Sequence, residues 1–456
     1  MATFQLTSGN DTFTGVAGEV NVVFGSIADL SSADVLTGSS DPGDVDRLRF
    51  TDGGVLAAGD FANVTGFEQL LLDFGTDLTL ADGLVGSSDT GSFKVDASDE
   101  SDTIDASGLT ALSVQLRVDL GQGDDSYTGG ALQEVFQISA GEITSGDTVS
   151  GGAGRDQFQI ASGTVLSATD LTNVSGIDEF ELVGGVTLEL VDGLGDAGQI
   201  SVLAAGSGDD VVNASAVTND QVLYRLGGGT DQVIGGGGQD FFFVDPASGD
   251  LDASDDLDGG AGLDVVRLVG GGTVSAAAMS AFSNVEQVRA GSDPANVTLV
   301  DSMTSSGQIR YAAESGLQQL DASGLSAARV VASFGSAAGT FLGGAAGDAV
   351  LIDADELTLS DNLDGGAGVD RLVVLGSGSV SAFDMVNVTG FEQLQLRGGA
   401  DVTLSDGFAV GSSLAVLLGA SADRVDASAE TGEIVRFVGI GAGDEMTGGA
   451  RNDRFE

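Results

Sequence analysis

The chain has 456 residues, of which 69 are acidic and 16 are basic, and its formal net charge at pH 7 is −53. It contains no His or Cys, so Ser-His-Asp and Cys-His nucleophiles, zinc sites made of His or Cys, and disulfide staples are excluded. The charge also disfavours nucleic acid and anionic membranes as partners, because both would be repelled.

Residues 1–33 are interpreted as the N-terminal start of a repetitive fold. The segment Met1–Gly15 lacks both a basic region and an apolar stretch, so it does not resemble a Sec-type signal peptide. Its phrase GNDTF at Gly9–Phe13 returns as RNDRF at Arg451–Phe455, so we expect the chain to start and stop at one phase of the repeat. No apolar run approaches the roughly 18–20 residues that cross a bilayer, and we expect no membrane insertion.

Three phrases then recur in one order and at one spacing. The phrase GGAG begins at Gly151, Gly259 and Gly365, which are 108 and 106 residues apart. Relatives of VTGFEQ begin at Val64, Val174, Phe282 and Val388, and relatives of DASGL begin at Asp105, Asn213, Asp321 and Asp426. We therefore predict four large repeats of about 107 residues, at 34–146, 147–254, 255–360 and 361–456, with the chain ending in mid-repeat.

Short apolar stretches alternate with Gly, Asp, Asn and Ser throughout each repeat. Stretches such as DVVRLVG at Asp264–Gly270 are typical of strands bounded by turns. Helical periodicity is scarce, and Ser275–Ser283 is the best candidate for a short helix. Many short strands at fixed spacing predict an all-β solenoid whose coils stack on one another. A coil of roughly 18 residues would stack about 25 times, at about 4.8 Å per coil.

A nine-residue pattern, G-G-x-G-x-D-x-U-x with U apolar, lies inside the large repeat. Four full matches begin at Gly151, Gly235, Gly259 and Gly365. Near matches begin at Leu120, Ala205 and Leu226, and weaker ones at Gly343 and Gly448. Because the glycines permit positive φ and close backbone approach, carbonyl oxygens can point into the turn beside the Asp carboxylate. An oxygen cage with ligands at about 2.3–2.6 Å suits Ca²⁺ better than Mg²⁺ or zinc.

These nonapeptides resemble those of the RTX, or haemolysin-type, calcium-binding proteins of Gram-negative bacteria. The resemblance implies a right-handed parallel β-roll or β-helix, calcium-driven folding outside the cell, and type I secretion through an uncleaved C-terminal signal. It is close over the nonapeptides and loose over the 107-residue frame. Two departures are the absence of a recognisable C-terminal signal and a longest nonapeptide run of two, at Leu226–Phe243.

Carried over residue by residue, the resemblance implies a set of Ca²⁺ ligands. The aspartates are Asp156, Asp231, Asp240, Asp264 and Asp370, with Asp125 and Asp210 as further ligands. The glycines that would shape the turns and offer carbonyls are Gly151, Gly154, Gly235, Gly238, Gly259, Gly262, Gly365 and Gly368. Because the nonapeptide runs are short, complete sites would need further ligands from neighbouring coils.

Each of these features also has a simpler interpretation. A GGxGxD turn can redirect the chain without binding metal. The N-V-T/S asparagines at Asn63, Asn173, Asn296 and Asn387 are interpreted as turn residues rather than glycosylation acceptors. Phe241–Phe243 is either a ligand patch or an ordinary strand, and alternation places at least one of its rings in the core.

Three functions are compatible with the sequence. The first is an extracellular calcium-binding structural protein, S-layer-like or adhesin-like, that self-assembles into a surface layer, filament or adhesive stalk. Its expected partners are calcium ions, copies of itself docked head-to-tail, and cell-surface polysaccharide. The second is a spacer or folding module of a larger secreted toxin or hydrolase. The third, a carboxylate-based polysaccharide-active β-helix enzyme, is disfavoured because the aspartates recur with the repeat and no unique pair stands out.

Overall fold

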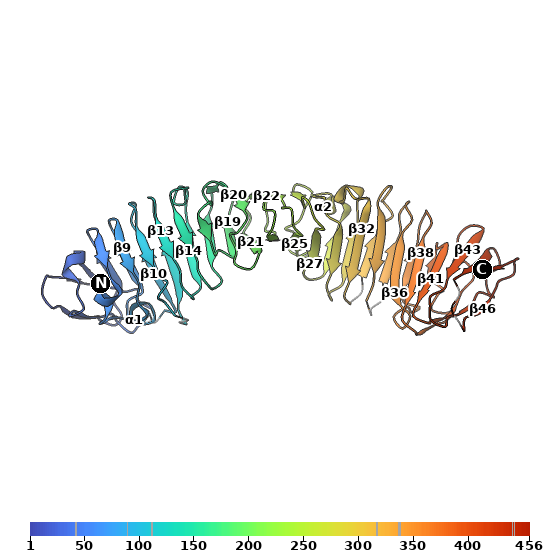
Figure 1. Ribbon diagram of the computed structural model, residues 1–456, viewed down its shortest axis with the longest axis horizontal. Helices are drawn as coiled ribbons and strands as arrows, with labels where there is room; N and C mark the ends of the chain where they lie inside the picture. Colours follow the sequence, from blue (N-terminus) through green and yellow to red (C-terminus); the bar gives the residue numbers. More distant parts are fainter. Residues whose placement is uncertain are drawn as a thin grey trace. The chain divides into compact units, whose positions relative to one another are not determined.

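The computed structural model describes residues 1–41, 43–88, 90–110, 113–315, 318–335, 339–439, 441 and 443–456. In these residues the chain is an all-β, parallel β-solenoid, which confirms the predicted fold class. It divides into two compact units, Met1–Gly238 (unit one) and Gln239–Glu456 (unit two). Within each unit the long strands follow one another side by side in chain order, as the labels β10 and β14, or β36 and β38, show in Figure 1.

Unit one has a main sheet of long strands and an opposite face of short ones. The long strands are β1 (Ala2–Gln5), β3 (Asn21–Gly25), β5 (Arg47–Phe50), β8 (Gln69–Leu72), β10 (Ser92–Asp96), β12 (Gln115–Asp119), β14 (Glu134–Ile138), β16 (Gln157–Ala161), β19 (Glu179–Val183), β21 (Gln199–Ala205) and β23 (Gln221–Arg225). The short strands are β2 (Thr12–Thr14), β4 (Val35–Thr37), β6 (Gly54–Leu56), β7 (Val64–Thr65), β9 (Thr76–Thr79), β11 (Thr103–Asp105), β13 (Ser126–Thr128), β15 (Thr148–Ser150), β17 (Val165–Leu166), β18 (Val174–Ser175), β20 (Thr187–Val191), β22 (Val211–Ala216) and β24 (Gln232–Ile234).

Unit two repeats this arrangement. Its long strands are β25 (Phe241–Val244), β27 (Val265–Leu268), β30 (Gln287–Ala290), β32 (Gln308–Ala313), β34 (Arg329–Ser333), β36 (Ala349–Asp353), β38 (Arg371–Leu375), β41 (Gln393–Arg397), β43 (Ser413–Leu417), β45 (Ile434–Val438) and β47 (Arg454–Phe455). Its short strands are β26 (Asp256–Asp258), β28 (Gly272–Val274), β29 (Phe282–Ser283), β31 (Ala295–Thr298), β33 (Gln318–Asp321), β35 (Gly339–Leu342), β37 (Asn362–Asp364), β39 (Ser379–Val380), β40 (Val388–Thr389), β42 (Asp401–Thr403), β44 (Arg424–Asp426) and β46 (Glu445–Thr447).

Helices in the described residues are single turns. They are α1 (Asp82–Val85), α2 (Ala276–Met279) and the 3₁₀ turns η1 (Ile27–Asp29), η2 (Ala58–Phe61) and η3 (Asp301–Met303). The helix predicted within Ser275–Ser283 is confirmed as α2, where the Ala278 N–H donates to the Ser275 hydroxyl at the N-cap. None of the described helices has the length and apolar character that a bilayer crossing requires.

One coil of the solenoid takes 22 residues in the centre of unit one. Phe136 of β14 lies opposite Phe158 of β16, and Phe158 lies opposite Phe180 of β19, in parallel register at a spacing of 22 residues. An average coil of roughly 18 residues is therefore too short, although the coils from β12 to β14 and from β34 to β36 do take 18 residues. In this coil the extra residues lie in the corner after the long strand: residues 139–147 separate β14 from β15, whereas residues 151–156 between β15 and β16 are the turn of the nonapeptide itself.

The interior is a column of apolar side chains between the main sheet and the short strands. Alternate residues of each long strand point inward, as in β10, where Phe93 and Val95 are buried while Lys94 lies on the outer face. Successive coils place like residues above one another, and the Phe136 and Phe158 rings meet edge-to-face with centroids 5.4 Å apart. Each coil therefore rests on the side chains of its neighbours, as in other solenoids.

The large repeat corresponds to an interruption of the short-strand face. The coil that begins with β5 carries two short strands, β6 and β7. Strand β7 ends a small sheet with β2 and β4, whereas β6 begins the next one with β9, β11, β13, β15 and β18. The double strand recurs as β17/β18, β28/β29 and β39/β40, each time at a relative of VTGFEQ. We call these coils switch coils, and a period near 107 residues holds about five coils of 22 residues.

In each switch coil the third residue of the VTGFEQ relative lies in the left-handed backbone region. Gly66, Gly176 and Gly390 have φ angles of 72°, 67° and 76°. The third copy, FSNVEQ, places Asn284 at this position with a φ of 51°, and Asn is one of the few non-glycine residues that adopt this conformation readily. The Asn284 side chain also donates from Nδ2 to Oδ1 of Asp258 at 2.7 Å, which supports the turn.

The N-V-T/S asparagines tie backbone segments together. Nδ2 of Asn63, Asn173 and Asn387 each donates to a backbone carbonyl 28 or 31 residues earlier, at 2.9–3.2 Å. Asn296 lies in β31, where its Nδ2 approaches Oγ1 of Thr273 at 3.4 Å. These contacts give the asparagines a role in joining coils.

Candidate functional site

The nonapeptide aspartates lie at the corners of the coil, each just before a strand. Asp156, Asp240, Asp264 and Asp370 precede long strands, and Asp125, Asp210 and Asp231 precede short ones. All seven are buried, with exposed fractions of 4% or less. Burying a carboxylate is unfavourable unless it is hydrogen-bonded or paired, so their partners determine what these corners can do.

In unit two the corner carboxylates form ladders between successive coils. The backbone N–H of Asp240 donates to Oδ1 of Asp264 (2.8 Å), and the N–H of Asp264 donates to Glu286 (3.2 Å). A second ladder runs from Asp348 to Asp370 (2.6 Å), and the N–H of Asp370 continues it to the next coil at 2.9 Å. Each acid thus satisfies a backbone donor of the coil before it.

Unit one contains the same ladders. The N–H of Asp102 donates to Oδ1 of Asp125 (2.8 Å), and the N–H of Asp125 donates to Oδ1 of Asp147 (2.6 Å). The N–H of Asp210 donates to Oδ1 of Asp231 at 3.0 Å. The structure therefore brings predicted site residues next to one another and adds acids from coils without a nonapeptide, such as Asp102 and Asp147.

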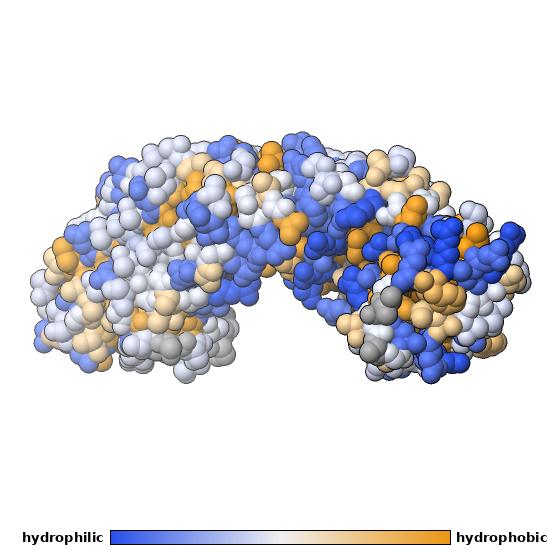
Figure 2. All heavy atoms as spheres, turned by 45° about the vertical axis from the view of Figure 1, so that its right-hand side comes forward, coloured by the Kyte–Doolittle hydropathy of each residue, from blue (hydrophilic) through white to orange (hydrophobic). Residues whose placement is uncertain are grey.

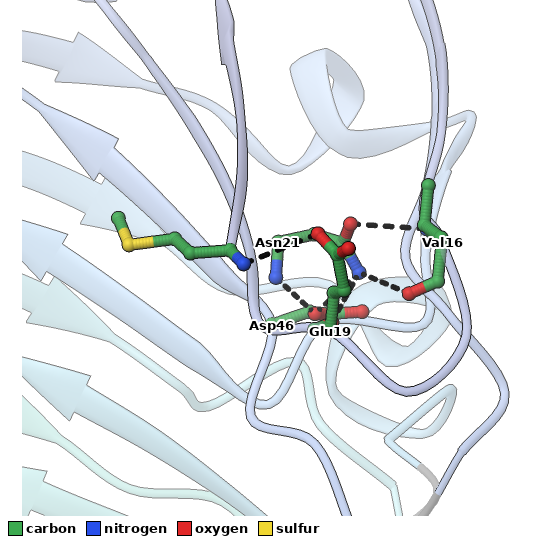
Figure 3. Close-up of polar contacts among 5 residues, drawn as sticks. Val16, Glu19, Asn21 and Asp46 are labelled. Atoms are coloured by element: carbon green, nitrogen blue, oxygen red, sulfur yellow. Dashed lines mark hydrogen bonds and ion pairs between the residues drawn. The ribbon is translucent and has the colours of Figure 1, made fainter.

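The first coil of unit one shows how an amide can hold such a corner (Figure 3). Asn21 stands where later coils have an acid, and both its backbone N–H and its Nδ2 donate to Oδ1 of Asp46, at 2.7 and 2.8 Å. Its Oδ1 accepts from the N–H of Val16 at 3.0 Å, and its Nδ2 also donates to the carbonyl of Glu19 at 2.9 Å. The fold therefore accepts Asn at this position.

The corner glycines allow the backbones of neighbouring coils to come close. A Cβ on Gly151 would lie 2.1 Å from the carbonyl oxygen of Gly176 and 2.7 Å from Oδ2 of Asp156. A Cβ on Gly259 would lie 2.3 Å from the carbonyl oxygen of Asn284 and 2.8 Å from a carboxylate oxygen of its own corner acid. A carbonyl and a carboxylate thus converge on a position that only glycine can hold.

The other predicted glycines lie at the same corners. A Cβ on Gly154, Gly365 or Gly368 would come within 2.8 Å of a backbone oxygen, and one on Gly238 within 3.0 Å. Gly262 has a φ of 143°, in the region that favours glycine, and Gly235 is buried. The glycines are therefore needed by the packing of the coils, whether or not a cation is bound.

Several corner carboxylates have one oxygen without a hydrogen bond. Oδ2 of Asp125, Asp156, Asp264 and Asp370 is buried and has no hydrogen-bond partner among the described residues. Burial raises the pKa of Asp125, Asp264 and Asp370 to about 7, and neighbouring carboxylates in the ladders also raise it. Burial likewise raises the pKa of Asp210 to about 7. These corners hold ionised acids only at a cost in free energy.

An aspartate outside the ladders shows the opposite behaviour. Asp192, in the turn after β20, accepts hydrogen bonds from the hydroxyl and N–H of Thr218 and from the N–H and Nδ2 of Asn219, at 2.6–2.9 Å. The Thr218 hydroxyl is the main cause that lowers the pKa of Asp192 to about 2. Aspartates that only close a turn can thus be fully satisfied by the protein, unlike Asp125, Asp156, Asp264 and Asp370 of the ladders.

The ladder corners fit Ca²⁺ in charge and in ligand type. A buried, unpaired carboxylate oxygen beside closely approaching carbonyls is the kind of ligand set that a hard cation prefers, and a cation would offset the cost of burying the charge. In the described residues, however, no group of three or more His, Cys, Asp or Glu side chains is placed to hold one metal ion. A cation at Asp264 or Asp370 would therefore need backbone carbonyls for most of its coordination.

The nonapeptide pattern does not include Glu134, which holds the same type of corner as Asp156. The Glu134 N–H donates to Oδ1 of Asp156 at 2.8 Å. Burial, and then Asp156, raise the pKa of Glu134 to about 9, and burial and Glu134 raise the pKa of the buried Tyr127 hydroxyl. The pattern has Asp at the sixth position, whereas this corner has Glu there, and the glycine pair Gly129–Gly130 in the same frame is its signal in the sequence.

A second acid was missed in the last relative of DASGL. That relative reads DASAE, and its final residue, Glu430, takes the place of Leu109, Val217 and Leu325 in the other copies. Glu430 is as buried as those apolar residues, and burial followed by the nearby Glu433 raises its pKa to about 7. The sequence does indicate this unusual acid, because the fifth residue of the phrase is apolar in the other three copies.

Comparison with known proteins gives this chain no relatives. No protein-family model, no curated protein and no solved structure matches it. Its function has to be inferred from the corner carboxylates and from the outer faces of its sheets.

Proposed function

We propose that this chain is an extracellular calcium-binding structural protein that self-assembles into a surface layer, filament or adhesive stalk. The observation that carries this proposal is the buried carboxylate oxygen without a hydrogen bond at Asp125, Asp156, Asp264 and Asp370. It recurs in both units at corners of the coil, so a cation requirement would be distributed along the solenoid. No single corner is singled out, which favours a structural role over a catalytic one.

Calcium would act on the balance between repulsion and packing. Successive ladder acids are joined by direct contacts, such as that of the Asp348 N–H with Asp370, so their charges lie in adjacent coils. Without a cation these groups must be protonated or repel each other. With Ca²⁺ bound by Asp264, Asp370 and carbonyls of the glycine turns, the ionised form becomes the stable one. Low cytosolic calcium would keep the chain unfolded for type I secretion, and calcium outside would fold it.

The first test removes and restores calcium on the full chain. We expect EGTA to reduce the β signal in circular dichroism and to dissociate assemblies seen by electron microscopy, and added Ca²⁺ to restore both. Unchanged spectra and particle sizes after chelation would contradict the calcium role. Calcium-dependent folding without any assembly would instead favour the spacer or folding module of a larger secreted protein.

A matched pair of substitutions tests the corner itself. Asp264→Asn removes a ladder charge but keeps a side chain that the fold accepts at Asn21. Asp256→Asn removes an exposed charge on β26 of the same unit. We expect the first variant to need several-fold more Ca²⁺ for folding and the second to behave as the parent chain. Equal calcium midpoints in the two variants would show that Asp264 is not a ligand.

A further inference from the structure

The basic residues of this acidic protein are concentrated on the main sheets. Of the 16 basic residues, 13 lie in long strands, and only Arg155, Arg424 and Arg451 lie elsewhere. Each of these 13 side chains is at least partly exposed, since the inward positions of the same strands are apolar. The acids are mostly in corners and turns, so the outer faces of the sheets have a charge pattern of their own.

In unit two, five consecutive long strands carry no acid, and four of them carry an arginine. Strands β25, β27, β30, β32 and β34 contain Arg267, Arg289, Arg310 and Arg329, and no Asp or Glu. None of these four arginines forms an ion pair with a described carboxylate. The Arg289 guanidinium donates to the amide oxygen of Gln287 at 3.2 Å, and that of Arg329 donates to Gln308. We call the outer surface of these strands the arginine face.

The arginines of this face lie so close together that their positive charges repel each other. Arg267 and Arg289 are direct partners in the parallel register of β27 and β30, so their backbones are about 4.8 Å apart. Like charges directly opposite each other destabilise a sheet. Nε of Arg289 is in addition buried without a hydrogen-bond partner among the described residues. With 69 acids in the chain, leaving these arginines unpaired indicates that an anion from outside completes the face.

Aromatic rings adjoin the arginines on the same face. In β25 the Phe242 ring points into the core, while Phe241 and Phe243 point outward and are partly exposed. Their rings are stacked, with centroids 6.3 Å apart and an interplanar angle of 25°. Phe243 is the register partner of Arg267, so flat apolar surface and positive charge lie side by side.

A shallow hollow lies at the edge of the arginine face. Its volume is about 280 Å³, and it is lined by Gly262, Leu263, Glu286, Ser306, Gln308 and Arg310. The Glu286 carboxylate already accepts from the N–H of Asp264 at 3.2 Å and from the Thr304 hydroxyl at 3.4 Å. The hollow therefore offers a guanidinium, an amide and a hydroxyl to a polar ligand. In Figure 2, which brings the right-hand side of Figure 1 forward, hydrophilic residues cover much of that side, with hydrophobic patches between them.

We propose that the arginine face binds a linear polysaccharide whose sugar rings carry carboxylates. Arginines would pair with the carboxylates, Gln287 and Gln308 would bond hydroxyls, and the faces of sugar rings would lie on Phe241 and Phe243. A sugar ring is comparable in length to the strand spacing of about 4.8 Å, so one chain can cross several strands. This proposal stands apart from calcium-dependent assembly, because neither the four arginines nor the glutamines and phenylalanines named here belong to a corner ladder, although the hollow borders one at Glu286.

Two other polyanions fit the face less well. Nucleic acid carries about one charge per 1.7 Å of duplex, so a chain with a net charge of −53 would repel it strongly. The acidic turns of a second copy could pair with Arg267 and Arg289, but they offer no flat apolar surface to cover the Phe241 and Phe243 rings.

The test uses the full chain in calcium, with hyaluronate as the carboxylated polysaccharide and dextran as the neutral one. We expect hyaluronate to bind with an affinity that falls as salt is raised, and dextran not to bind. Arg267→Gln with Arg289→Gln should weaken hyaluronate binding about fivefold to tenfold. The control Arg424→Gln, on β44 and paired with Asp401, should leave it unchanged. Equal binding by both variants would overturn the proposal.

A second pair of measurements separates sugars from peptides. Phe241→Ala with Phe243→Ala should weaken hyaluronate binding while leaving the weaker binding of poly-glutamate unchanged, because only sugars use the rings. If poly-glutamate binds as tightly as hyaluronate and the double variant has no effect, the face receives acidic protein segments and the proposal fails. Each variant is first compared with the parent by circular dichroism in calcium, so that a loss of fold is not read as a loss of binding. A chain that binds hyaluronate but folds without calcium would contradict only the calcium proposal.

Discussion

Lys94 on the outer face of unit one and the arginines of the arginine face in unit two differ in how their charges are balanced. In unit one, Lys94 pairs with Asp96 and lies 3.7 Å from Asp119, so its charge is neutralised within the sheet. In unit two, Arg267 and Arg289 lie side by side and have no ion pair with a described residue.

The interiors and corners of the two units, in contrast, follow one plan. Both have alternating apolar columns, glycine corners and carboxylate ladders. Packing and corner geometry constrain these positions, whereas the outward positions of the long strands are free to vary. This difference indicates that residues for binding a partner are most easily placed on the outer face, because substitutions there leave the core packing and the corners of the coil unchanged.

We expect the largest effect from pH, which should change the stability of the calcium-free chain. The change should be similar in the two units. Burial raises the pKa of Asp125 and Asp210 in unit one, and of Asp264 and Asp370 in unit two, from 3.8 to about 7. A raised pKa means that the folded state binds protons that the unfolded state has released, so its stabilising effect is complete below about pH 4 and is lost as pH rises through about 7.

We therefore expect the thermal midpoints of both units to fall between pH 4 and pH 8 in EGTA. Saturating Ca²⁺ should remove most of this dependence, because calcium replaces the protons. Calorimetry over this range measures it. A calcium-free chain that becomes more stable as pH rises would show that the corners are satisfied without cation or proton.

The next largest effect is expected from substitutions in the core. They also show which unit gives rise to each unfolding transition. Phe158→Ala in unit one and Phe242→Ala in unit two each remove a fully buried ring, so each should cost about 3–5 kcal/mol of unfolding free energy. Urea denaturation in calcium should show the transition of the altered unit moved to lower urea while the other stays in place. If both transitions move together in both variants, the units unfold as one.

Replacing the corner glycines should lower the stability by a smaller amount, again in both units. Gly151→Ala and Gly259→Ala place a Cβ within 2.3 Å of a carbonyl oxygen of the next coil, and each should cost about 2 kcal/mol or more. Gly108→Ala and Gly324→Ala are matched controls in the DASGL phrase, with open space at the new Cβ, and should change stability by less than about 1 kcal/mol. Similar losses in all four variants would show that corner crowding is unimportant.

The smallest effect is expected from removing a basic side chain from the outer face. The resulting change in stability should have opposite signs in the two units. Lys94→Gln breaks a partly exposed ion pair in unit one and should destabilise it by about 0.5 kcal/mol. Arg267→Gln relieves the repulsion by Arg289 in unit two and should be neutral or slightly stabilising. Chemical denaturation at low salt resolves the two, and the difference should shrink at 1 M salt. The same sign for both would remove the contrast between the faces.

The sequence was sufficient for the solenoid and for the position of its corners. Strand alternation, glycine turns and the spacing near 107 residues are local or periodic signals, and each relative of VTGFEQ coincides with a switch coil, although the phrase itself does not indicate a double strand. The coil length was wrong because a corner can lengthen without changing the nonapeptide. The pairing of Asp264 with Glu286 and of Arg267 with Arg289 depends on register between coils, which a single sequence does not reveal.

The switch coils have a mechanical consequence. At each one the small sheet on the short-strand face stops and another begins, so among the described residues the ladder of strand-to-strand hydrogen bonds on that face is interrupted there. When the chain is pulled from its ends, it should therefore unfold one block at a time. Unfolding should pause where the next small sheet begins. Each block of about 107 residues would release roughly 350 Å of extended chain. A filament made of such chains would lengthen in steps under load and absorb force before it broke.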